Sequence, residues 1–93
     1  MDTNRLVDDI IVARYVKTGA MPSADDLSRA ILDKPTTSPA QRVYRLRRGA
    51  MVMTGDIIAS LSNYSGLSPA YFMDTADRPS FDNELLRIIQ TKK

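Results

Sequence analysis

Apolar residues recur at helical spacing along this chain, in short segments separated by Gly, Pro and hydroxyl residues, and this pattern constrains the fold most strongly. No segment of the 93 residues alternates convincingly with the period of two that a half-buried strand requires. Ser and Thr at segment starts are typical helix caps, and Gly commonly closes helices. The sequence therefore predicts one small all-α domain of five or six helices. Helices are expected over residues 4–17, 38–48, 54–66 and 68–72. Another helix is expected to begin at the Ser23 cap and to end before Pro35, and a last one is expected to begin at residue 80.

The chain contains neither Cys nor His, and this excludes most enzyme chemistry. Disulfide scaffolds, thiolate or imidazole zinc sites, and nucleophiles activated by histidine all need one of these residues. Two acidic pairs could suggest a metal site, but Asp8 and Asp9 are expected on a solvated helix face, and Asp25 and Asp26 at a helix start. We therefore expect a protein that is not an enzyme and that has no cofactor, metal or evident small-molecule ligand.

Neither a signal peptide nor a membrane span is expected. The longest apolar run near the start, residues 10–13, is too short to cross a bilayer and lies among charged residues. The sequence thus predicts a cytoplasmic, nucleoid-associated protein without a membrane partner.

The net charge of +2 is distributed unevenly along the chain. Residues 1–33 carry six acids and four bases, and residues 49–93 carry five acids and four bases. Residues 34–48 carry five bases and no acid. A concentrated basic segment of this kind favours contact with phosphate groups.

The helix expected over residues 38–48 has two different faces. Val43 and Leu46 lie on one side, while Gln, Tyr and Arg side chains occupy the other. Arg can donate two hydrogen bonds to guanine, Gln can pair with adenine, and long cationic side chains reach phosphates. A solvated basic face is the alternative, but the absence of acids and the capped helix immediately upstream favour DNA binding. We predict base contacts from Gln41, Tyr44 and Arg45. The predicted phosphate contacts are Lys34, Ser38, Arg42 and Arg48. The backbone amides that begin the second and third helices are also expected to contact phosphates.

Two stretches resemble the lambda-repressor-like (XRE or Cro) family of helix-turn-helix proteins. Residues 43–49, with the sequence VYRLRRG, resemble the end of the family's recognition helix, and residues 58–74 resemble its fourth helix and the short helix that follows. Ala70-Tyr71-Phe72 and the later Asp82 and Glu84-Leu85 are similar to EspR-type mycobacterial regulators. The resemblance covers about residues 23–89. The chain departs from the family pattern at two places. The linker 33–37 is longer than the turn of ordinary members, and Arg47 stands where many members have an acid that makes a structural ion pair.

The resemblance implies a sequence-specific, repressor-like transcriptional regulator that binds double-stranded DNA. Its helix-turn-helix domain is expected over residues 1–74, and a linker with a C-terminal helix, a possible dimerisation element, over residues 75–93. Replacement of the family's acid by Arg47 is expected to add positive charge and to remove the ion pair. The alternative function is a protein-interaction module or antitoxin-like adaptor that keeps this fold without reading DNA.

The last helix carries an apolar stripe of Phe81, Leu85, Ile88 and Ile89. A single short recognition helix reads only a few base pairs, so useful specificity usually needs two copies. We therefore predict a homodimer whose interface contains Phe81, Leu85 and Ile88. The alternative is that the stripe covers the core of its own chain, and periodicity alone does not separate the two.

Overall fold

A computed structural model describes residues 3–31, 38–49, 51–73 and 79–91. Within these ranges the chain forms five α-helices and one short 3-10 helix and contains no strand, so the predicted all-α class is confirmed. None of the helices described is both long and apolar enough to cross a membrane. The helices are α1 (Thr3–Thr18), α2 (Ala24–Ala30), α3 (Pro39–Arg47), α4 (Gly55–Ser65), the 3-10 helix η1 (Pro69–Phe72) and α5 (Phe81–Thr91).

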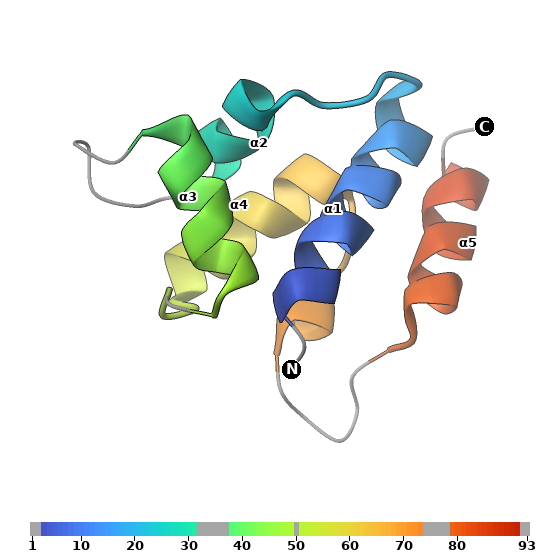
Figure 1. Ribbon diagram of the computed structural model, residues 1–93. Helices are drawn as coiled ribbons and strands as arrows, with labels where there is room; N and C mark the ends of the chain where they lie inside the picture. Colours follow the sequence, from blue (N-terminus) through green and yellow to red (C-terminus); the bar gives the residue numbers. More distant parts are fainter. Residues whose placement is uncertain (1–2, 32–37, 50, 74–78, 92–93) are drawn as a thin grey trace.

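Helix α1 lies at the centre of the structure. It contacts α3, α4 and α5, and Figure 1 shows α2 and α3 on one side of it and α5 on the other. Every helix contributes buried apolar side chains to one continuous core. The core residues are Leu6, Val7, Ile10, Ala13, Leu27, Ala30, Ile31, Leu46, Ile57, Leu61, Leu67, Tyr71, Phe72 and Ile88.

The helices begin where local capping residues stand. The side chains of Ser23, Ser38 and Thr54 each accept a hydrogen bond from the third backbone amide of the helix that follows. Gly49 and Gly66 follow the ends of α3 and α4 with positive φ angles of 71° and 82°, a conformation that disfavours other residues. These contacts span only a few residues, which is why the sequence predicts most helix boundaries closely.

Helix α2 ends within the limit that the sequence sets. Pro35 sets only an upper limit for this helix, and the structure ends it at Ala30. Ile31 then adopts an extended backbone, with φ −91° and ψ 103°, and its side chain is fully buried. Burial of Ile31 in the core thus accompanies the end of α2 at Ala30.

The expectation that Asp8 and Asp9 form a solvated face is wrong for Asp9. Its carboxylate is buried and accepts a hydrogen bond from the hydroxyl of Tyr71. This contact joins α1 to η1. Because the Tyr71 hydroxyl supplies a donor, the buried carboxylate is satisfied inside the core.

Helix α5 belongs to the same core as the rest of the chain. Ile88 is buried, and Phe81 and Leu85 pack against the core as partly buried side chains. The boundary predicted between residues 74 and 75 therefore does not separate two cores. The three side chains predicted as a dimer interface, Phe81, Leu85 and Ile88, face the protein's own core where α5 packs against α1, whereas Ile89 of the same stripe is exposed.

A buried carboxylate anchors α5 to the segment before η1. Glu84 accepts hydrogen bonds from the backbone amide of Ser68 at 2.9 Å and from its hydroxyl at 2.8 Å. Arg87 donates to the same carboxylate at 2.9 Å. Burial alone would raise the pKa of Glu84, but the hydrogen bonds from Arg87 and Ser68 and the charge of Arg87 outweigh it, so the pKa lies below its ordinary value.

We expect Glu84→Gln to destabilise the fold by about 1–3 kcal/mol at pH 7, because the amide replaces one acceptor oxygen by a donor that faces other donors. The lowered pKa of Glu84 means that its stabilising effect is present above the pKa of an unfolded glutamate, about 4.3, and is lost as pH falls through the lowered value. Urea unfolding at pH 7 and between pH 5 and 3 measures both effects. The control is Asp82→Asn, at an exposed position of α5; an equal loss in both variants would contradict the expectation.

Candidate nucleic-acid interface

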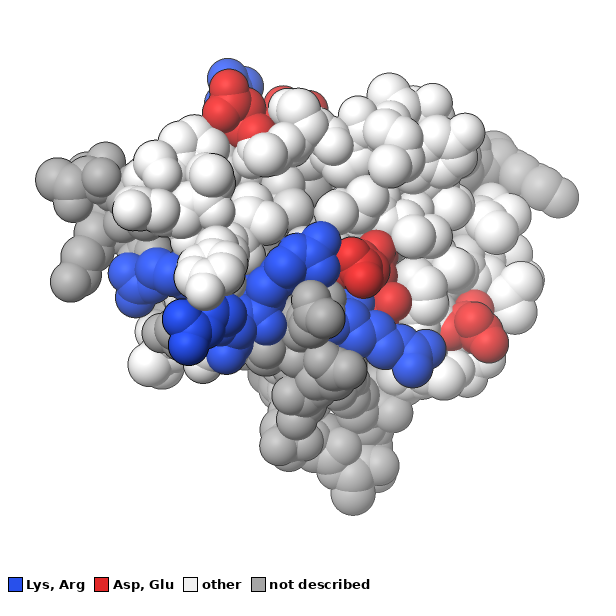
Figure 2. Space-filling view, viewed as in Figure 1, with Lys and Arg blue, Asp and Glu red and all other residues white. Residues whose placement is uncertain are grey.

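Helix α3 presents the two faces that the sequence predicts. Leu46 is buried and Val43 packs against the core, whereas Gln41, Tyr44 and Arg48 are exposed. These three positions are separated by three and four residues, so they form one stripe along the helix. Figure 2 shows Lys and Arg atoms in a band that crosses α3 and continues toward α1, where acidic atoms lie beside the band. Further acidic atoms at the top of the view lie over α2.

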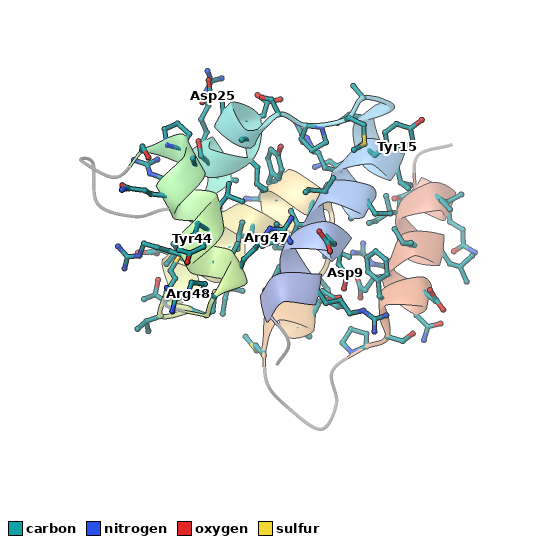
Figure 3. The ribbon with its side chains drawn as sticks, in the orientation of Figure 1. Asp9, Tyr15, Asp25, Tyr44, Arg47 and Arg48 are labelled. Carbon is teal, nitrogen blue, oxygen red and sulfur yellow. The ribbon has the colours of Figure 1, made fainter. Side chains whose placement is uncertain are left out.

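Tyr44 and Arg48 contact each other within this stripe. The Nη1 atom of Arg48 donates a hydrogen bond to the Tyr44 hydroxyl at 3.2 Å. The guanidinium carbon of Arg48 lies 5.4 Å from the centre of the Tyr44 ring, within the range of a cation–π contact. In Figure 3 both side chains lie on the outer side of α3. The two residues therefore form one exposed unit on the last turns of the helix.

Arg47 points in a different direction, toward α1. Its Nη2 atom lies 3.0 Å from a carboxylate oxygen of Asp8, and the side chains are 34% and 63% exposed. Figure 3 shows Arg47 on the side of α3 that faces α1. Arg47 thus forms an ion pair of its own with Asp8 of the neighbouring helix, a contact that the sequence does not predict. The Arg47 charge is partly balanced within the protein.

Two other predicted contact residues on α3 are partly buried. Arg42 directs its Nη1 atom toward the carbonyl oxygen of Ser28 in α2, at 3.4 Å, so this side chain lies between the two helices. Arg45 is half-buried on the edge of the exposed stripe. Lys34 lies outside the described residues. The arginines of this segment thus differ in their exposure, since Arg42 and Arg45 are half-buried and Arg48 is exposed.

The predicted residues Ser38 and Gln41 are engaged in the helix cap. The Gln41 side-chain oxygen accepts a hydrogen bond from the Ser38 amide at 3.4 Å, and the Ser38 hydroxyl oxygen accepts one from the Gln41 amide at 3.3 Å. A two-bond contact with adenine requires both the oxygen and the nitrogen of the Gln side chain. The cap uses one of the two lone pairs of the Gln41 side-chain oxygen and does not use the NH₂ group.

Acidic side chains stand at the start of α2, where the sequence predicts contact between backbone amides and phosphate. Asp25 and Asp26 are both exposed, and the Asp26 amide already donates to the Ser23 hydroxyl. Asp25 lies at the top of Figure 3, away from Tyr44 and Arg48. The two carboxylates oppose the approach of a phosphate to this helix end.

Sequence reasoning missed the roles of Asp8 and Asp9. For Asp9 a signal exists, because at 100° per residue it falls between Ala13 and Val16 on the apolar side of α1. An acid at such a position needs a buried partner. For Asp8 no comparable signal exists, because its contact with Arg47 depends on how α1 and α3 pack together.

Comparison of the chain with protein-family models, with curated proteins and with solved structures finds no match.

The Asp8–Arg47 pair is expected to contribute about 0.2–1 kcal/mol to stability, the range of partly exposed ion pairs. A double-mutant cycle with Asp8→Ala, Arg47→Ala and the combined variant, followed by urea unfolding, measures this coupling. Asp26 and Arg29 provide the matched control, because their atoms are 3.9 Å apart and their side chains are 55% and 80% exposed. A coupling no larger than that of the control would contradict a bracing role for Arg47.

Proposed function

We propose that this protein is a repressor-like regulator that binds double-stranded DNA with α3 in the major groove, as in the lambda-repressor-like helix-turn-helix family. The observation that carries the proposal is the exposed stripe of Gln41, Tyr44 and Arg48 within a basic band. A helix that reads DNA needs one face anchored in the core and the other free to enter the groove. Leu46 supplies the anchor, and α2 packs against α3 from the upstream side.

The proposal assigns different tasks to the two ends of α3. The N-terminal residues of a recognition helix approach the base edges, so Gln41 is the proposed base contact. Arg45, which the sequence predicts as a base contact, lies half-buried in the last turn of α3, and we propose that it contacts a phosphate instead. The last turn lies nearer the DNA backbone, where Arg48 is the proposed phosphate contact. Lys34 and Ser38 remain proposed phosphate contacts, whereas Arg42 has to leave its position beside α2 to make one.

Binding to duplex DNA should depend steeply on salt. If Lys34, Arg45 and Arg48 each neutralise one phosphate, the slope of log K against log salt should be roughly −3, and if all five cations of residues 34–48 do so it should be about −4.5. Fluorescence anisotropy with a labelled duplex between 50 and 200 mM salt measures the slope. A slope near zero, or no binding at low salt, contradicts the DNA proposal and favours a protein-interaction module.

A short recognition helix reads only a few base pairs, so useful specificity needs two half-sites. We therefore propose that the DNA-bound form is a homodimer. Ile88 is not accessible as an interface residue, since it lies in the core. Leu86 and Ile89 are 56% and 45% exposed on the outer side of α5. These two residues therefore replace Phe81, Leu85 and Ile88 as the proposed contact between copies. The same exposed pair supports the alternative, a module that binds another protein.

Replacing Leu86 and Ile89 by Lys should leave a folded monomer that binds DNA more weakly, because the advantage of binding two half-sites together is lost. Sedimentation, circular dichroism and DNA titration follow mass, helicity and affinity. Leu85→Lys with Ile88→Lys is the matched variant, and it should instead lose helicity, because these side chains cover the core. A Leu86 and Ile89 variant with unchanged mass and unchanged DNA affinity would exclude α5 as the interface.

A further inference from the structure

We infer that Tyr44 and Arg48 together form a single binding unit for one phosphate of the DNA backbone. The inference rests on the proposed function and deepens it, because it moves Tyr44 from reading a base edge to holding a phosphate. It also makes the Tyr44 hydroxyl, and not only the Arg48 charge, a determinant of affinity.

The hydrogen bond between the two side chains leaves donors directed away from it. The Tyr44 hydroxyl oxygen accepts the bond from Arg48 Nη1, so the hydroxyl proton remains available to a second acceptor. A guanidinium carries five N–H donors, and this contact uses one of them. A neutral donor and a charged donor group therefore lie side by side on the surface. Phosphate oxygens only accept hydrogen bonds, and so they match this pair.

The contact with Tyr44 also restricts Arg48 before any ligand binds. An exposed arginine ordinarily samples many rotamers, and fixing it costs conformational entropy. Here the ring of Tyr44 lies against the guanidinium and its hydroxyl holds Nη1. Less freedom is lost on binding when a side chain is already held near its bound geometry.

The position of the unit on α3 favours a phosphate over a base. Arg48 is the C-cap residue of α3, and Tyr44 lies one turn before it. The N-terminal residues of a recognition helix contact base edges, so the other end lies closer to the backbone. Helix C-termini carry partial negative charge, and a phosphate approaches such an end only where a cation offsets this charge. Arg48 provides that cation, whereas neighbouring Arg47 is paired with Asp8.

The test compares Tyr44→Phe, Arg48→Ala and the combined variant in DNA titrations. Each is titrated with a duplex selected from a random pool and with an unrelated duplex of equal length. Tyr44→Phe keeps the ring and removes only the hydroxyl, so affinity should fall about fivefold on both duplexes, the usual effect of one lost hydrogen bond. The salt slope should stay unchanged in Tyr44→Phe and become shallower by about 0.9 in Arg48→Ala.

The two changes should not add. If both side chains hold the same phosphate, Tyr44→Phe should have little further effect once Arg48 is replaced. Arg29→Ala is the charge control, because it removes an exposed cation of α2 that should leave affinity unchanged. Circular dichroism checks that each variant is folded.

Three results would overturn the inference. A change in base preference in Tyr44→Phe would make Tyr44 a base-reading residue, and unchanged affinity would show that its hydroxyl holds no phosphate. Fully additive losses would show that the two side chains act separately. In all three cases the wild-type protein still binds duplex DNA, so the proposed function stands. Absence of binding by the wild-type protein would instead overturn both.

Discussion

The packing of α1 against α3, α4 and α5 is the contact on which the rest of the structure depends. Helices as short as the nine residues of α3 are marginal in water on their own, so tertiary packing must hold them. Leu46 is the fully buried side chain of α3, and the α1 side chains Leu6, Val7 and Ile10 belong to the same core. The direction in which α3 presents its exposed stripe therefore follows from its packing against α1 and α2.

Polar contacts between helices complement this apolar packing and concentrate at helix ends. Lys17 and Arg14 of α1 donate to the carbonyl oxygens of Asn63 and Tyr64 in the last turn of α4. The Ser60 hydroxyl donates to the last carbonyl of α2 at 2.8 Å. Helix ends leave such backbone groups without partners within the helix, and side chains from neighbouring helices satisfy them. Because hydrogen bonds need a defined geometry, these contacts fix the relative positions of the helices more specifically than apolar packing alone would.

The same inter-helix contacts reduce the charge that α3 offers to a ligand. Residues 34–48 contain five cations, but Arg47 pairs with Asp8 and Arg42 reaches toward a carbonyl of α2. Arg48, which contacts Tyr44 at the end of α3, is exposed, whereas Arg42, Arg45 and Arg47 are half-buried. A count of basic residues along the chain therefore overstates the number of charges that face outward, since some of them join helices together.

The amino-acid sequence by itself determined the helical class, most helix ends and the two faces of α3. Caps such as Ser38 with Gln41, and the closing Gly49, act across three or four residues, so their hydrogen bonds can be anticipated from neighbours in the chain. Only the tertiary structure decided that Asp8 pairs with Arg47 and that Ile88 lies in the protein's own core. The partners in these contacts are far apart along the chain, and the way the helices pack decides which side chains meet.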